Sequence, residues 1–142
     1  MAKGGPIIVI EDDKDDQELL ADVFRDMAVP NEIKYFESCE VAYEYLRTTN
    51  DSPFIIFSDI NLPGMNGSDL KRLINEDVYL RRKSVPYIFL STTTQEQAVL
   101  ESYECLSQGF FTKPASMSEL KTMIASILHY WNLAKHPNPK LQ

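Results

Sequence analysis

The strongest constraint on the fold of this chain is a series of short, uninterrupted apolar runs. Runs of four residues span positions 7–10, 54–57 and 87–90. Each is short enough for a β-strand, and an apolar run without alternation is typical of a strand buried on both faces in a parallel sheet. Residues 32–36 instead alternate charged and apolar side chains, as an edge strand does. Residues 110–112 form a fifth, shorter candidate strand.

The segments between these runs show the apolar spacing of amphipathic helices. Residues 19–27, 41–46 and 70–74 carry apolar side chains three or four positions apart. The clearest apolar stripe lies in residues 120–131, and residues 95–106 are also predicted to be helical, with apolar side chains on more than one face. Five alternations of strand and helix predict a doubly wound α/β sandwich built on a parallel sheet.

The size and charge of the chain exclude several functions. A chain of 142 residues is the size of one domain. Its 21 acidic and 14 basic residues give a net charge of -7 without a basic stripe, so we expect no direct contact with nucleic acid. No apolar run approaches the roughly 18 residues of a membrane span, and the first residues lack the apolar core of a signal peptide. We therefore expect a cytoplasmic protein that does not bind a membrane.

Acidic, hydroxyl and basic side chains follow the predicted strands at their carboxyl ends. Glu11 and Asp12 come after the first strand, Asp59 after the third, Ser91 after the fourth and Lys113 after the fifth. In an open parallel sheet these ends meet at one crevice, where ligands bind. Converging carboxylates raise one another's pKa unless a hard divalent cation lies among them, and oxygen ligands favour Mg²⁺ or Mn²⁺ over zinc. Together these groups supply the parts for phosphoryl transfer to an aspartate.

In these residues the chain resembles the receiver domains of two-component response regulators, which are common in bacteria. The family has acidic residues after strand one, an aspartate ending strand three before a Pro-Gly loop, a Ser or Thr after strand four, and Lys-Pro after strand five. The matching residues here are Glu11-Asp12-Asp13, Asp59 before Pro63-Gly64, Ser91, and Lys113-Pro114. The resemblance implies a flavodoxin-like fold with strand order 2-1-3-4-5, a receiver domain over residues 6–131, and tails at 1–5 and 132–142.

The resemblance also implies a role for each site residue. Asp59 is expected to accept the phosphoryl group and Lys113 to pair with that group. Four groups are expected to hold a Mg²⁺ ion, with Mn²⁺ as a substitute: Glu11, Asp12, Asp59 and the backbone carbonyl of Asn61. Ser91 and Phe110 are the expected switch residues, because the family's aromatic ring turns inward when the hydroxyl moves. The bond between Lys113 and Pro114 is expected to be cis.

The implied function is that of a stand-alone receiver, similar to single-domain regulators of the phytochrome-associated type. That narrower similarity lies in Leu80-Arg81-Arg82 and in residues 90–93 and 111–114. The chain is expected to take a phosphoryl group from a histidine kinase or a histidine phosphotransfer protein, to lose it by hydrolysis, and to catalyse no other reaction. Because the chain has no output domain, the signal is expected to pass to a protein partner through residues 95–131, with self-association as the simplest case.

Other interpretations stay open at this point. A Mg²⁺-dependent phosphohydrolase that works through an aspartyl phosphate is disfavoured, because such enzymes usually carry a second aspartate two residues after the nucleophile, where this chain has Asn61. A phosphorylation-independent adaptor is disfavoured by the complete set of acidic, hydroxyl and lysine residues. Asp15 and Asp16 are expected to lie in the first turn of a helix, facing solvent and favouring its dipole.

Overall fold

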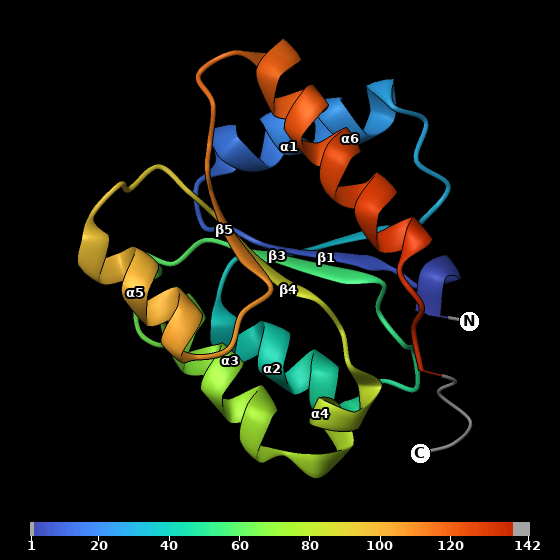
Figure 1. Ribbon diagram of the computed structural model, residues 1–142, viewed down its shortest axis with the longest axis vertical. Helices are drawn as coiled ribbons and strands as arrows, with labels where there is room; N and C mark the ends of the chain where they lie inside the picture. The colour runs from blue at the N-terminus through green and yellow to red at the C-terminus, as the bar shows by residue number, and fades with distance from the viewer. Residues whose placement is uncertain (1, 138–142) are drawn as a thin grey trace.

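The computed structural model describes residues 2–137, which form a five-stranded parallel sheet with helices on both faces (Figure 1). The sheet order is β2-β1-β3-β4-β5, which confirms the predicted fold class and strand order. The strands are β1 (Ile7–Ile10), β2 (Ile33–Phe36), β3 (Ile55–Ser58), β4 (Tyr87–Ser91) and β5 (Gly109–Thr112). Each strand begins within a residue or so of its apolar run, because a run buried on both faces leaves little freedom in where the strand lies.

Two helices cover one face of the sheet and four cover the other (Figure 1). On the first face lie α1 (Lys14–Asp26) and α6 (Met117–Leu133). On the second lie α2 (Cys39–Thr48), α3 (Gly67–Glu76), α4 (Val78–Lys83) and α5 (Glu96–Glu104). The short helix α4 was not predicted, because its six residues span less than two turns and show no apolar period.

The central strands divide the core into two halves. Every residue of β1, β3 and β4 is buried. Since side chains alternate along a strand, Ile7 and Val9 pack with α1 and α6, whereas Ile8 and Ile10 pack with α2 and α3. Strand β2 is half-buried, as the alternating pattern of an edge strand predicts.

Segments at both ends of the described chain pack against the domain. A short 3-10 helix, Ala2–Gly4, precedes β1, and the Asn31 amide donates hydrogen bonds to two carbonyls of residues 3–5 at 2.9 and 2.8 Å. Helix α6 ends at Leu133, and the ring of His136 beyond it packs on Phe54 with 5.6 Å between ring centroids. Residues 138–142 of the predicted C-terminal tail lie outside the described residues.

The start of α3 packs tightly against the end of β3. A Cβ atom placed on Gly67 would lie 2.4 Å from the backbone oxygen of Asp59 and 2.8 Å from the hydroxyl of Ser58. The buried Tyr87 hydroxyl donates a hydrogen bond to the Gly67 carbonyl at 2.9 Å, which holds the start of α3 close to the sheet. The helix can therefore begin here only because the residue has no side chain.

We predict that Gly67→Ala lowers the free energy of unfolding by about 1–3 kcal/mol, the usual cost of overpacking a tight contact. Urea denaturation followed by circular dichroism would measure it. The control is Gly4→Ala, since a Cβ atom at Gly4 meets nothing within 4 Å. Equal urea midpoints for the two variants would contradict this account of the helix start.

Candidate functional site

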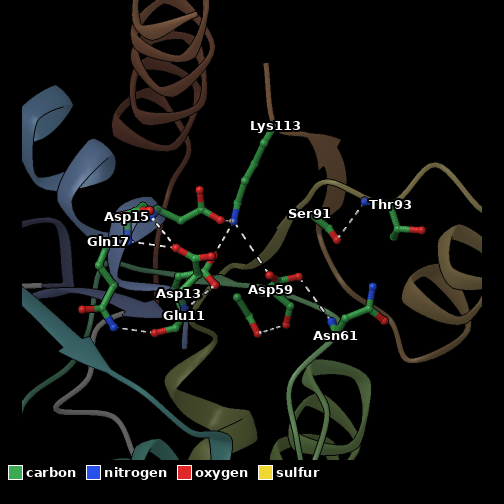
Figure 2. Close-up of polar contacts among 11 residues, drawn as sticks. Glu11, Asp13, Asp15, Gln17, Asp59, Asn61, Ser91, Thr93 and Lys113 are labelled. Carbon is green, nitrogen blue, oxygen red and sulfur yellow. Dashed lines mark hydrogen bonds and ion pairs between the residues drawn. The ribbon is translucent and has the colours of Figure 1, made fainter. Parts of the chain in front are cut away.

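The predicted site residues meet at the carboxyl edge of the sheet (Figure 2). Glu11 and Asp12 follow β1, Asp59 follows β3, and Lys113 follows β5. Backbone hydrogen bonds fix the register of these strand ends: the Asp59 N–H donates to the Ile10 carbonyl at 3.0 Å. The sheet itself therefore brings together groups that are up to 102 residues apart in sequence.

Three carboxylates form the acidic part of the site. Carboxylate oxygens of Glu11, Asp12 and Asp59 all lie within 4.8 Å of one another. Glu11 is buried, and that burial raises its pKa to about 7; the Lys113 ammonium opposes this shift and the charge of Asp59 adds to it. A cluster of hard oxygen donors with excess negative charge suits Mg²⁺ or Mn²⁺.

The Lys113 ammonium is the cation of the site. Its side chain is only 9% exposed and forms ion pairs with Glu11, with Asp16 at 3.1 Å and with Asp59 at 3.8 Å. Burial lowers the pKa of Lys113, but the hydrogen bond and charge of Glu11, with the charge of Asp59, outweigh burial and raise the pKa above its usual value. Lys113 therefore stays charged and can bind an anion formed at Asp59.

Asp59 is held from two sides. One carboxylate oxygen accepts a hydrogen bond from the Asn61 N–H at 3.2 Å, and the other is the oxygen that faces Lys113. The Ser58 hydroxyl donates to the Asp59 backbone oxygen at 2.8 Å. A small pocket opens beside this carboxylate and is also lined by Glu11 and Lys113. The Asp59 carboxylate thus lies between the acidic cluster and the ammonium.

The two predicted switch residues lie on neighbouring strands. Ser91 ends β4, is fully buried, and its hydroxyl oxygen accepts a hydrogen bond from the Thr93 N–H at 3.3 Å (Figure 2). Its backbone oxygen accepts from the Lys113 N–H at 2.9 Å. Phe110 on β5 is half-buried, and its ring packs on Phe89 with 6.2 Å between centroids.

Two expectations from the sequence were wrong. Asp16 does not simply face solvent: its side chain is one-third exposed and accepts a hydrogen bond from Lys113. It lies in the first turn of α1, which begins close to the carboxyl end of β1, and this closeness was the signal available for the contact. The Lys113–Pro114 bond is trans, since no cis peptide bond occurs in residues 2–137; trans is favoured at X-Pro bonds unless the surroundings select cis.

No helix within residues 2–137 is long and apolar enough to cross a membrane.

Comparisons with known proteins agree on one family. Residues 7–125 match the model of the response regulator receiver domain. The response regulator Rcp1 of Synechocystis sp. is 26% identical over 130 residues, which cover 88% of this chain and 87% of Rcp1. The chemotaxis protein CheY of Pseudomonas aeruginosa is 24% identical, with 89% of this chain and 98% of CheY covered.

Solved structures give the same result. The phosphorylated cyanobacterial phytochrome response regulator RcpA superposes with a TM-score of 0.83 and 29% identity, over 94% of this chain and 98% of RcpA. The Mn²⁺-bound form of Rcp1 superposes with a TM-score of 0.78 and 25% identity, over 94% of this chain and 99% of Rcp1. The predicted similarity to phytochrome-associated regulators is thereby confirmed. The chain belongs to the response regulator receiver domain family.

Proposed function

We propose that this receiver domain, residues 6–131, accepts a phosphoryl group on Asp59 from the phosphohistidine of a histidine kinase or a histidine phosphotransfer protein. The observation that carries the proposal is the position of the Asp59 carboxylate between an acidic cluster and a buried ammonium 3.8 Å away. In the transfer, a carboxylate oxygen of Asp59 forms a bond to phosphorus while the bond from phosphorus to the histidine nitrogen breaks. Hydrolysis of the resulting acyl phosphate returns the carboxylate and releases inorganic phosphate.

The acidic cluster fits the divalent cation that is typical of receiver domains. The carboxylates of Glu11, Asp12 and Asp59 and the backbone carbonyl of Asn61 would hold Mg²⁺, with Mn²⁺ as a substitute. All four donors are hard oxygen atoms, and the three carboxylates are already within 4.8 Å of one another. The similar regulator Rcp1 has been crystallised in a Mn²⁺-bound form. When bound, the cation supplies positive charge that offsets the charge of the carboxylates and the transferred phosphoryl oxygens.

Lys113 and Ser91 would bind the phosphoryl oxygens. The ammonium lies 3.8 Å from an oxygen of the Asp59 carboxylate. From there it could donate a hydrogen bond to an oxygen of a phosphoryl group attached to that carboxylate. The Ser91 hydroxyl accepts from the Thr93 N–H with its oxygen, and its own proton is not used in that bond. It is therefore suited to donate to a phosphoryl oxygen.

The signal would leave by binding, through the surface of residues 95–131. When Ser91 moves toward the phosphoryl group, space opens for the Phe110 ring, and α5 presents Leu100 and Tyr103, which are 52% and 58% exposed. A partner that binds one of the two conformations more tightly would bind the phosphorylated and unphosphorylated forms with different affinity. The partner is a downstream protein or a second copy of this chain, in the cytoplasm, where ATP-dependent kinases form phosphohistidine. Neither nucleic acid nor membrane takes part directly.

A phosphohydrolase is less well supported as the function. The residue two positions after Asp59 is Asn61, whose amide side chain cannot act as a general acid or base. Release of phosphate from a small phosphate monoester in many turnovers would favour the enzyme, and normal partner binding by Asp59→Asn would favour an adaptor.

We predict that Asp59→Asn abolishes labelling by acetyl phosphate in the presence of Mg²⁺, because it removes the proposed acceptor, a carboxylate that lies beside Lys113 and is more exposed than the buried Glu11. Mass spectrometry after borohydride trapping would locate the label. The control is Asp22→Asn on the exposed side of α1, which should label like the wild type. A label that maps to Asp12 or Asp13 would overturn the assignment.

We predict that Asp12→Ala weakens Mg²⁺ binding by at least about tenfold. Loss of a residue that only hydrogen-bonds a metal ligand typically lowers metal affinity about 10- to 100-fold, and loss of the ligand itself lowers it at least as much. Isothermal titration calorimetry would measure the affinity. Asp15→Ala is the matched control, since it removes an equal charge nearby without touching the cluster. Similar losses in both variants would mean that general charge, and not ligation by Asp12, sets the affinity.

We predict that beryllofluoride with Mg²⁺, which mimics the phosphoryl group, changes amide hydrogen exchange in residues 95–112. The reason is that one switch residue, Ser91, lies just before this segment and the other, Phe110, lies within it near its end. Mass-spectrometric exchange with and without beryllofluoride would test it. Changes confined to the loops around Asp12 and Asp59 would show that this output route is wrong.

A further inference from the structure

Lys113 has three carboxylate neighbours whose surroundings differ. Glu11 is almost fully buried, with 3% of its side chain exposed, while the Asp59 and Asp16 side chains are 13% and 33% exposed. The ammonium donates hydrogen bonds to Glu11 and Asp16, whereas its 3.8 Å separation from Asp59 is too long for one. In this structure the ammonium lies closer to Glu11, which follows β1, and to Asp16 of α1 than to the predicted phosphoacceptor Asp59.

Glu11 has two competing uses. It is the partner of Lys113, and it is also one of the three clustered carboxylates that suit a cation. A cation bound in that cluster would attract the Glu11 carboxylate and so weaken the ion pair between Glu11 and the Lys113 ammonium. Asp16 is not a member of the cluster found among residues 2–137. Asp16 is therefore the ion-pair partner that Lys113 would keep when a cation is bound to the cluster.

Asp16 is also well placed to hold a fixed position. It lies in the first turn of α1, where its backbone N–H donates to the side chain of the N-cap residue Asp13 at 3.1 Å. Leu20, Val23 and Phe24 of the same helix are buried in the core. A lysine side chain is a flexible four-carbon chain, so a second hydrogen bond, donated to a carboxylate on a rigid helix, reduces the positions that the ammonium samples.

We propose that Asp16 is a positioning residue for phosphorylation: it keeps the Lys113 ammonium beside Asp59 when a cation engages Glu11. The inference rests on the proposed function of Asp59. Asp16 itself touches neither the acceptor carboxylate nor the transferred group. It acts through Lys113, whose remaining N–H is directed to the phosphoryl oxygens.

Asp15 provides a matched control from the neighbouring position. Its backbone N–H donates to the same Asp13 carboxylate, at 2.8 Å, and its side chain carries the same charge in the same helical turn. Lys113 forms its ion pairs with Glu11, Asp16 and Asp59. Asp15→Asn and Asp16→Asn therefore make the same change of charge near the site, and only Asp16→Asn replaces a charged acceptor of the ammonium with a neutral one.

The test compares initial rates of phosphorylation by acetyl phosphate at saturating Mg²⁺. This small donor is used because it does not depend on docking of a kinase against α1. We expect Asp16→Asn to lower the rate about three- to tenfold, because the amide oxygen can still accept a hydrogen bond from the ammonium but without the charge that roughly doubles its strength. We expect Asp15→Asn to stay within about twofold of wild type, and Asp16→Asn to have no further effect in a Lys113→Ala background, as a double-mutant cycle requires. Equal rates for the two aspartate variants, or an equal loss with and without Lys113, would overturn the proposal.

A spectroscopic measurement separates this inference from the proposed function. We expect the Lys113 ammonium signal in ¹⁵N-lysine NMR of the Mg²⁺-beryllofluoride complex to persist in wild type and Asp15→Asn, and to broaden in Asp16→Asn as the ammonium exchanges with water. An unchanged signal in Asp16→Asn would remove the positioning role while Asp59 labelling still stands. A wild-type chain that takes up neither acetyl phosphate label nor beryllofluoride would overturn the proposed function and this inference together.

Discussion

The ion pairs of one buried ammonium hold this site together. Lys113 offsets one negative charge among four carboxylates, those of Glu11, Asp12, Asp16 and Asp59. Keeping Glu11 charged here has a cost, because burial raises its pKa to about 7 despite the neighbouring lysine, and the charge of Asp59 adds to that shift. A fold that carries this cost at one sheet edge is suited to a divalent cation and an incoming phosphoryl group, because both change the charge balance there.

The geometry of these charges is a consequence of the strand order. In the order β2-β1-β3-β4-β5, the ends of β1 and β3 are adjacent and carry the acidic residues, while β4 and β5 carry the hydroxyl and the ammonium. Backbone hydrogen bonds at this edge, from Asp59 to Ile10 and from Lys113 to Ser91, fix the relative heights of the strand ends. Neither the acidic half nor the basic half is complete within one strand and helix unit, so the site exists only when β1, β3, β4 and β5 have come together.

The sequence predicted the strands, and the meeting of polar residues at their carboxyl ends, because both depend on local patterns and one topological rule. Apolar runs located the buried strands, and the carboxyl ends of parallel strands must meet at one edge. Helix α4 was missed because six residues carry too little periodicity. The contact of Asp16 with Lys113 was missed for another reason: capping and the helix dipole already explain an acidic first turn, and the distance between α1 and the end of β5 depends on packing across 97 residues of sequence. The trans bond before Pro114 depends on surroundings that local sequence does not describe.

Aromatic packing connects this charged edge to the outer strand. The Tyr87 and Phe89 rings pack edge to face with centroids 5.3 Å apart, and Phe89 in turn packs on Phe110 at 6.2 Å. The same Phe89 ring closes the space above Gly67, where a Cβ atom would lie 2.7 Å from it, and the Tyr87 hydroxyl holds the Gly67 carbonyl. The backbone of Asp59 and the ring of Phe110 therefore border a common wall of side chains. Because close-packed interiors transmit small displacements, a shift of the β3 end on the proposed phosphorylation of Asp59 would reach the Phe110 ring through Phe89 as well as through the space left by Ser91.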